Sequence, residues 1–316
     1  MRFERTCVAA TLAVGVMMWA AVTAAAIAPT VAIVKSSSVG PFEEATSTIV
    51  DALRKKPLEP ELLVFDLKGS SEGAAAILTQ VRQADPRLIV TVGSLATNVV
   101  LNEKWSVPIV FSMVLFPEMS GFVPTAEQAL TGSSLDIPPE RSLELLRRLL
   151  PAAKRIGVLY NPTETGRVVE KIRAAAAKAG LQLEAKVVEQ SADAVSALEQ
   201  LMANVDVVWA LADSHVFTPQ TTPALILSTL RQRIPLFGLS PGQVRSGALL
   251  ALSCDYADIG RQTAEQVQRI LAGTNAAEVP VTAPRKLLLS LNLRSADHLG
   301  VRVDAGLVGE AAEVIR

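Results

Sequence analysis

Short apolar runs alternate with longer amphipathic stretches along most of the chain. Short runs rich in leucine and β-branched residues are typical of buried parallel strands, and an apolar residue at every third or fourth position is typical of a helix. The predicted strands are Val31–Lys35, Leu62–Asp66, Leu88–Val92, Pro108–Ser112, Arg155–Tyr160, Gln182–Val188, Val205–Leu211, Pro235–Leu239 and Ala248–Leu252. The predicted helices are Phe42–Lys55, Glu72–Ala84, Ser94–Asn102, Arg141–Leu149, Thr165–Ala179, Asp193–Ala203, Pro223–Arg233 and Ala257–Leu271.

The order of these elements predicts the fold class. The alternation of strand and helix occurs in two series, and parallel strands joined by helical crossovers form open, doubly wound sheets. The sequence therefore predicts an α/β protein with two Rossmann-like lobes, parallel sheets and a ligand cleft between the lobes. The stretch Met113–Pro139 is rich in proline, glycine, serine and threonine, and we expect it to join the two lobes.

Residues 1–28 have the pattern of a secretory signal. Arg2 and Arg5 precede the apolar run Cys7–Ala28, which ends in small residues. A positive start, an apolar stretch and an A-x-A-like end are typical of a cleavable signal peptide. We therefore expect export to the periplasm, with a mature chain that begins between about Ala25 and Thr30. The apolar run is also long enough to span a bilayer, so an anchor formed by an uncleaved N-terminal helix stays open as the alternative.

Composition and charge exclude several classes of protein. The chain has 30 basic and 31 acidic residues, so it has no excess of positive charge for binding nucleic acid. Two cysteines are too few for a disulfide framework or a cysteine-based zinc site. The sequence contains no G-x-x-x-x-G-K-[ST] and no H-E-x-x-H motif. We therefore expect no enzyme activity, no cofactor, no metal and no nucleic-acid partner.

Ligands of open α/β sheets bind beyond the carboxyl ends of the strands. This rule predicts ligand contacts in the polar loops that follow the predicted strands. In the first lobe these positions are Ser36, Ser37, Ser38, Gly93, Ser94 and Ser112. In the second lobe they are Asn161, Asp213, Ser214, His215, Ser240, Asp255 and Tyr256.

The same residue types also have purely structural interpretations. Asp213 and Asp255 suit a helix cap or a turn as well as a ligand contact, and Ser94 suits a helix cap. A helix N-terminus is also a site for anions. Two interpretations therefore stay open: caps and turns, or a zwitterion site with Asp213 or Asp255 at the ammonium group and Ser94 at the carboxylate. His215 is more typical of the surface, and Trp209 of the core.

Three stretches of the chain resemble one known family. They are TGSSLDIPPERSLELLRRLLPAAKRIGVLYNPTE at 131–164, VDVVWALADSHVF at 205–217 and LNLRSADHLGV at 291–301. In this order they resemble the substrate-binding proteins of ABC transporters, in the branch that includes tryptophan- and tyrosine-type binding proteins. The resemblance implies a type I periplasmic-binding-protein fold, in which the chain crosses between the lobes three times. It assigns residues 29–130 plus 255–280 to lobe one and residues 131–254 plus 281–316 to lobe two.

The resemblance also implies a function. Family members bind a small-molecule solute in the cleft and deliver it to an ABC permease in the inner membrane, so we expect an exported, monomeric protein that binds an amino acid or a derivative. It adds Thr97, one turn after Ser94, to the expected ligand contacts. Ser36–Ser38 and Cys254 stand where relatives often have His-Pro and glycine, so the fold transfers better than the ligand does. A ligand-sensing protein that reports to a membrane receptor or kinase stays open as the alternative.

Overall fold

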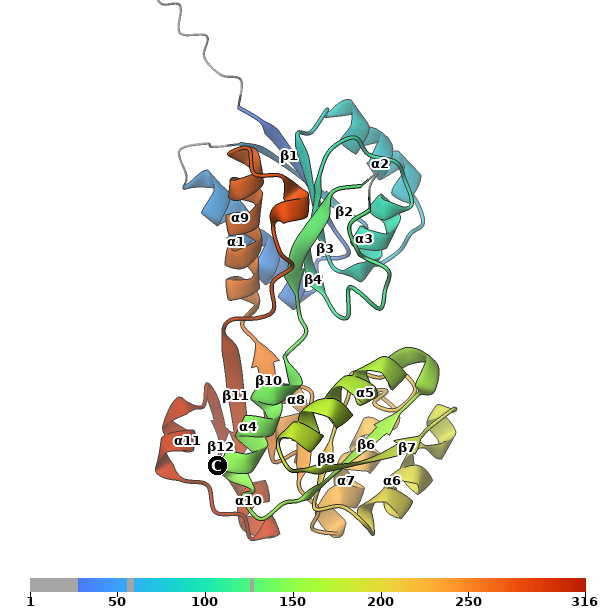
Figure 1. Cartoon of the computed structure of the whole chain (residues 1–316), viewed down its shortest axis with the longest axis vertical. Coiled ribbons are helices and arrows are strands. Elements are labelled where there is room, and N and C mark those ends of the chain that lie inside the picture. Colours follow the sequence, from blue (N-terminus) through green and yellow to red (C-terminus); the bar gives the residue numbers. More distant parts are fainter. Residues whose placement is uncertain (1–27, 56–59, 126–127) are drawn as a thin grey trace, which may run out of the picture.

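The computed structural model describes residues 28–55, 60–125 and 128–316, which form two lobes, each with helices on both faces of a sheet (Figure 1). The predicted signal peptide, with its alternative of an N-terminal anchor, lies outside the described residues apart from Ala28. No helix in these described ranges is both long enough and apolar enough to cross a bilayer.

The first sheet has the strand order β2-β1-β3-β4-β5, and its neighbouring strands pair in parallel. Its strands are β1 (Thr30–Lys35), β2 (Glu61–Asp66), β3 (Leu88–Val92), β4 (Ile109–Val114) and β5 (Leu130–Ser134). Its helices are α1 (Gly40–Arg54), α2 (Ala74–Gln83), α3 (Ser94–Leu101) and α9 (Tyr256–Leu271), with the 3-10 turn η2 (Ala276–Glu278).

Alternation along β1 divides the core of the first lobe into two halves. Val31 and Ile33 belong to the cluster that also holds α1 and α9, whereas Ala32 and Val34 belong to the cluster that holds α2 and α3. Successive side chains of a strand point to opposite faces, and here both faces are covered by helices. This explains why β1 is an unbroken apolar run rather than an alternating one.

The second sheet has the strand order β12-β11-β10-β9-β8-β6-β7, with parallel pairing except between β10 and β11. Its strands are β6 (Arg155–Tyr160), β7 (Gln182–Val187), β8 (Val207–Trp209), β9 (Leu236–Gly238), β10 (Leu250–Cys254), β11 (Leu287–Asn292) and β12 (Glu313–Ile315). Its helices are α4 (Pro139–Leu149), α5 (Pro162–Lys178), α6 (Ala194–Met202), α7 (Thr222–Arg231), α8 (Pro241–Arg245), α10 (Leu293–Leu299) and α11 (Ala305–Glu310), with the 3-10 turn η1 (Ser191–Asp193).

The described chain crosses between the lobes at three places (Figure 1). After β5 it enters α4 in the second lobe. After β10 it enters α9, which packs against α1 in the first lobe. After η2 it returns through β11, which pairs with β10. The predicted α/β fold with two Rossmann-like lobes is therefore confirmed.

The structure adds the strands β5, β11 and β12 to those that the sequence predicts. β5 lies inside the stretch expected to be only a joint, because its residues Leu-Thr-Gly-Ser-Ser lack the β-branched pattern of a buried strand. It pairs with β4, and the backbone of Gly132 approaches Phe111 so closely that a Cβ would collide with it. Because β5 ends at Ser134, the first crossing comes later than the lobe boundary expected at residue 130.

Candidate ligand-binding site

A cavity of about 290 Å³ lies between the two lobes. The segments that follow β4 and β5 line it from one side, and the ends of β8, β9 and β10 line it from the other. This position agrees with the rule that ligands bind beyond the carboxyl ends of the strands. Apolar side chains dominate the lining, and Asp136 is the one charged side chain among the described residues that form it.

Two stacked aromatic rings form part of the lining in the second lobe. Trp209 on β8 and Phe237 on β9 are register partners, and their ring centroids are 5.6 Å apart with an interplanar angle of 10°. Trp209 is 9% exposed, so most of the indole belongs to the core, as expected, while the rest borders the cavity. Tyr256, at the start of α9, also lines the cavity. Three aromatic residues therefore border the cavity.

Asp136 lies on the first crossing, between β5 and α4. Its carboxylate oxygen Oδ1 accepts a hydrogen bond of 2.7 Å from the backbone N–H of Phe116, and its own N–H donates to the Ser134 hydroxyl at 2.8 Å. Burial raises the pKa of Asp136 above its ordinary value, although the Phe116 N–H opposes this shift. No cation in the described ranges lies within ion-pair distance of it; Lys171, whose charge also opposes the rise in pKa, pairs with Glu118 at 3.3 Å.

Phe116 has a strained backbone at the edge of the cavity. Its φ is +52°, a left-handed value that is rare for a bulky residue. The hydrogen bond from its N–H to Asp136 stabilises this conformation. Phe116 and Asp136 also line a second cavity of about 280 Å³ that lies beside the first. Strain of this kind concentrates at ligand sites, and Phe116 lines the cavity.

Cys254, at the end of β10, is a buried free thiol that lines the cavity. Burial, assisted by the charge of Asp136, raises its pKa to about 12. It is therefore a neutral thiol at physiological pH, which makes it a poor nucleophile. The letters of Gly69–Gly73 match the G-x-S-x-G pattern, but both histidines of the chain lie in the second lobe, so Ser71 has no histidine as a base.

The residues predicted as ligand contacts in the first lobe do not line the interlobe cavity. Ser36 accepts a hydrogen bond from the N–H of Ala96 at 3.0 Å, so it stabilises the start of α3. Ser38 donates to Asp66, Ser37 lies in the loop after β1, and Ser94 is the first residue of α3. The cap residue of α3 is Gly93 rather than Ser94. Deeper in the lobe, Thr97 bonds to Thr91, and Ser112 accepts from Thr263.

Three polar positions predicted in the second lobe are helix caps. Asn161 caps α5, Ser240 caps α8 and Asp255 caps α9 through its contact with the N–H of Asp258. Asp255 also pairs with Lys286 at 2.5 Å. Burial alone would raise the pKa of Asp255, but Lys286 and the cap hydrogen bond outweigh it and hold the pKa below its ordinary value. Tyr256 is the one predicted contact that lines the cavity.

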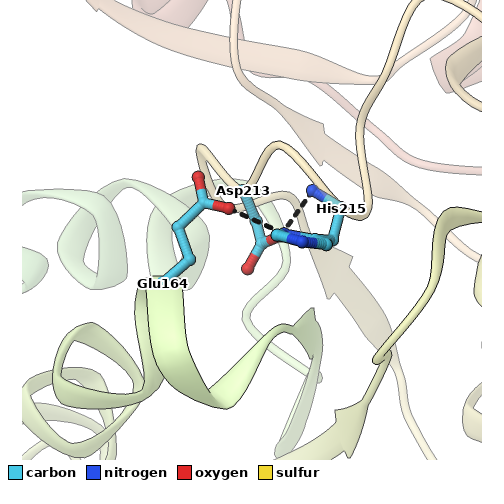
Figure 2. Close-up of side chains that lie close together, drawn as sticks. All are labelled: Glu164, Asp213 and His215. Atoms are coloured by element: carbon cyan, nitrogen blue, oxygen red, sulfur yellow. Dashed lines mark hydrogen bonds and ion pairs between the residues drawn. The ribbon is translucent and has the colours of Figure 1, made fainter.

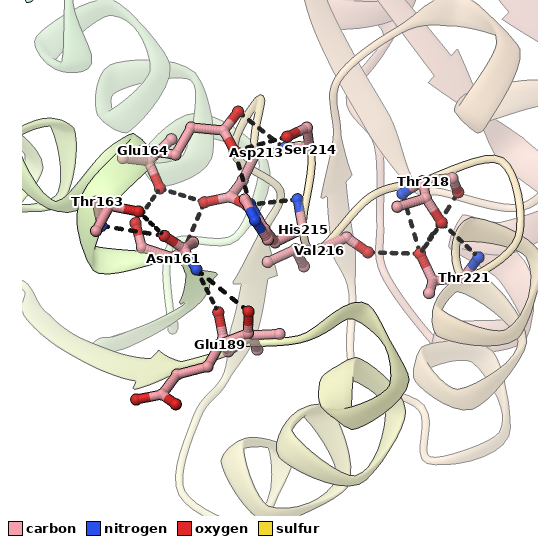
Figure 3. Close-up of polar contacts among 12 residues, drawn as sticks. Asn161, Thr163, Glu164, Glu189, Asp213, Ser214, His215, Val216, Thr218 and Thr221 are labelled. Carbon is pink, nitrogen blue, oxygen red and sulfur yellow. Dashed lines mark hydrogen bonds and ion pairs between the residues drawn. The ribbon is translucent and has the colours of Figure 1, made fainter.

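Asp213 lies inside a hydrogen-bonded cluster at the ends of β6 and β8 (Figure 3). Its carboxylate accepts hydrogen bonds from the N–H of Asn161 at 2.7 Å, the hydroxyl of Thr165 at 2.5 Å and the N–H of His215 at 2.9 Å. The side chain has no exposed surface. Asp213 therefore joins the loop after β8 to the start of α5, and it has no oxygen directed at the cavity lining.

Glu164 and His215 extend this cluster (Figure 2). The Nδ1 atom of His215 lies 3.0 Å from Oε2 of Glu164, and Ser214 donates to Glu164 through both its N–H and its hydroxyl. Burial would raise the pKa of Glu164, but these hydrogen bonds outweigh it and lower the pKa. Potential metal-ligand atoms of Glu164, Asp213 and His215 lie within 4.8 Å of one another, but protein donors already occupy the carboxylates.

The sequence analysis did not identify Asp136 and Phe116 as cavity residues. The carboxyl-end rule would have found Asp136 if β5 had been recognised as a strand, since Asp136 follows its end by two residues. Phe237 falls within a predicted strand, and only its pairing with Trp209 across two strands brings it to the cavity. Its role depends on strand order, which the sequence pattern does not contain.

Comparisons with known proteins agree with this architecture. The family model described as ABC transporter substrate binding protein matches residues 30–315. A curated tyrosine-binding protein of Clostridioides difficile (strain R20291) is 26% identical over 200 residues, or 62% of this chain. The chain spans 57% of the length of that relative.

Solved structures of similar fold cover 91% of this chain and 99% of their own. A domain from Streptococcus pneumoniae in complex with L-Trp is 21% identical with a TM-score of 0.65, and a conserved domain protein from Vibrio cholerae is 26% identical with the same TM-score. The ligand-free, open structure of a substrate-binding protein with adhesive properties from Clostridium difficile is 21% identical, with a TM-score of 0.77. With a two-lobe fold and a family match from residue 30 to residue 315, the chain belongs to the ABC transporter substrate-binding protein family, whose members bind small ligands.

Proposed function

We propose that the protein is an exported solute-binding protein that captures a small solute in the interlobe cavity and delivers it to an ABC permease in the inner membrane. The cavity itself carries this proposal. It lies between two lobes that three crossings of the described chain connect, and residues from both lobes line it. A ligand in this position contacts both lobes, and it does so best when they close around it.

Closure supplies the mechanism of capture. A ligand shifts the lobes toward the closed state only to the extent that it binds that state more tightly than the open one. The apolar rings of Trp209 and Phe237 supply contact area, and the few polar lining groups supply orientation. Hinge motion about the crossing segments then buries the solute, which the closed protein presents to the permease.

The solute is an amino acid or a related compound in this proposal. The names of two relatives support it, since one is a tyrosine-binding protein and another was solved in complex with L-Trp. The aromatic lining of the cavity fits an apolar side chain. The solute leaves unchanged, because the thiol of Cys254 is neutral and the carboxylates of the Asp213 cluster are bonded within the protein.

Export to the periplasm as a monomer with a cleaved signal peptide is part of the same proposal. The exported form should begin between about Ala25 and Thr30. Intact-mass measurement of protein from the periplasm tests this, and a chain that retains Met1 in membrane extracts would favour the N-terminal anchor.

Mass spectrometry of solute released from the purified protein tests the function directly. The identified solute should stabilise the protein by mass action, by about 2.7 kcal/mol at a hundredfold excess over Kd. Cells that lack the protein should lose high-affinity uptake of that solute. Chemical conversion of the bound compound, detected by chromatography, would contradict a pure binding function.

A further inference from the structure

We infer that the interlobe cavity recognises an aromatic α-amino acid through the first crossing, with Asp136 binding the ammonium group and Ser142, in the first turn of α4, binding the carboxylate. This inference rests on the proposed function and deepens it by naming the ligand class and the residues that select it. Asp136 lies on the first crossing and Ser142 in the helix that this crossing enters, so a ligand held by both would couple binding to closure.

The charge of Asp136 calls for a cation from the ligand. It is the one charged side chain among the described residues of the cavity lining, and it lies in largely apolar surroundings. Lys171, whose charge acts on Asp136 from beyond ion-pair distance, already pairs with Glu118. A partly buried carboxylate without a counter-charge is costly, and a ligand ammonium group removes that cost.

The two acids first considered for this role already have partners. Asp213 accepts three hydrogen bonds within the second lobe, and Asp255 caps α9 and pairs with Lys286. Neither lines the cavity. The ammonium group of a ligand in the cavity is therefore assigned to Asp136.

Ser142 provides the second contact. Its side chain lies in the first turn of α4, lines the cavity and is 3% exposed. Its hydroxyl makes no hydrogen bond within the described ranges. Every fully enclosed polar side-chain atom of those ranges has a hydrogen-bond partner, so the Ser142 hydroxyl is not fully enclosed. The hydroxyl is therefore accessible from the cavity. The N-terminus of α4 carries a partial positive charge, which favours an anion at the same place.

The aromatic residues of the cavity lining indicate that the ligand has an aromatic side chain. The stacked pair of Trp209 and Phe237, together with Tyr256 and Phe116, lines the same cavity as Asp136. A volume of about 290 Å³ is at the small end of the range of ligand pockets, so it suits a single amino acid better than a larger compound.

Calorimetry with three related probes tests the inference on the wild-type mature chain. L-Tryptophan carries both charged groups, tryptamine only the ammonium group and indole-3-propionate only the carboxylate. Each missing group should weaken binding, and loss of the ammonium group, which leaves Asp136 unpaired, should weaken it by about 30-fold or more. Equal affinity for L-tryptophan and indole-3-propionate would overturn the inference without any variant.

Two variants assign the groups. Asp136→Asn keeps the acceptor for the Phe116 N–H and should weaken L-tryptophan and tryptamine by about 30-fold, with little effect on indole-3-propionate. Ser142→Ala should weaken L-tryptophan and indole-3-propionate by about tenfold, with little effect on tryptamine. Asp297→Asn removes the same charge from the exposed surface of α10 and should leave all three affinities unchanged.

The outcomes separate this inference from the proposed function. If the protein binds or releases a solute that lacks an ammonium group or an aromatic ring, or if Asp136→Asn binds L-tryptophan as the wild type does, the inference is wrong and the proposed function stands. If the wild type binds none of the three probes and releases no solute, both fail. If Asp136→Asn does not fold, the probe comparison on the wild type decides.

Discussion

The backbone N–H of Asn161 donates a hydrogen bond of 2.7 Å to the carboxylate of Asp213, and this bond joins the ends of two neighbouring strands, β6 and β8. The same carboxylate accepts a hydrogen bond from the hydroxyl of Thr165. It also accepts one from the N–H of His215 (Figure 3). One buried side chain thus fixes the loop after β8 and the first turn of α5. Its role is to shape the second-lobe wall beside the cavity.

Replacement of Asp213 should therefore destabilise the protein without any ligand. Asp213→Ala leaves the three donors without their acceptor in a site with no exposed surface. An unsatisfied buried donor costs about 1–3 kcal/mol, so we expect the free energy of unfolding to fall by about 3 kcal/mol or more. Urea denaturation of the ligand-free protein measures this loss.

Asp193→Ala provides the matched control for this experiment. Asp193 is exposed before α6, and its side chain makes no cap hydrogen bond. Surface substitutions of this kind usually change stability by less than about 0.5 kcal/mol. Equal stability of the Asp213→Ala and Asp193→Ala variants would show that the Asp213 cluster does not support the lobe.

The residues at the strand ends show where sequence reasoning stops. Asp213, Asp255 and Ser240 were expected there and lie there, because the strands themselves were predicted from their apolar runs. Caps and ligand contacts use the same polar residue types in the same loops. Only the donors that surround each side chain separate the two roles, and these donors come from elements distant in the sequence.

Asp136 shows the opposite case. The Leu-Thr-Gly-Ser-Ser segment before it resembles a loop, because small polar residues form a strand only when the neighbouring strand allows close approach. That approach depends on Gly132 and Phe111, which belong to different predicted elements. Local periodicity predicts the fold. The place of Asp136 in the cavity lining, in contrast, depends on tertiary packing and cannot be read from the local pattern.

The contact between α1 and α9 gives a prediction for the first lobe. A Cβ on Gly260 would lie 2.6 Å from the carbonyl oxygen of Ala45 and 3.0 Å from the Cβ of Thr48. Gly260→Ala should therefore push the two helices apart and lower stability by about 1–3 kcal/mol. Thermal unfolding of the ligand-free protein should show a lower Tm.

Gly166 on α5 is the matched control, since apart from its chain neighbours and the nearby backbone of its own helix no atom lies within 4 Å of its Cβ position. Gly166→Ala should raise stability by about 0.5–1 kcal/mol, because alanine favours a helix interior. The two substitutions are chemically identical and should shift Tm in opposite directions. A shift in the same direction would mean that α1 and α9 have room to adjust.

Cys254 should resist alkylation in the folded protein. Its pKa of about 12 leaves almost no thiolate near neutral pH, and the residue is buried. Iodoacetamide at neutral pH should modify it at least about a hundredfold more slowly in the folded protein than in urea. The raised pKa reduces the fraction of reactive thiolate by at least this factor. Intact-mass spectrometry over time measures both rates. Rapid modification of the folded form would contradict a neutral, enclosed thiol beside Asp136.

The affinity for L-tryptophan should fall as the pH is lowered through the raised pKa of Asp136. The unliganded carboxyl group takes up a proton more readily than usual, whereas a bound ammonium group lowers its pKa again. Binding therefore releases a proton in this range, and affinity should rise with pH by at most about tenfold per unit. Lys171 is paired with Glu118, and the raised pKa of Cys254 keeps its thiol neutral, so Asp136 dominates the dependence. Calorimetry in two buffers of different ionisation enthalpy measures the released proton.

Asp136→Asn should abolish both the proton release and the pH dependence, while the control Asp297→Asn should keep them. A pH dependence that survives in Asp136→Asn would assign the titration to another group.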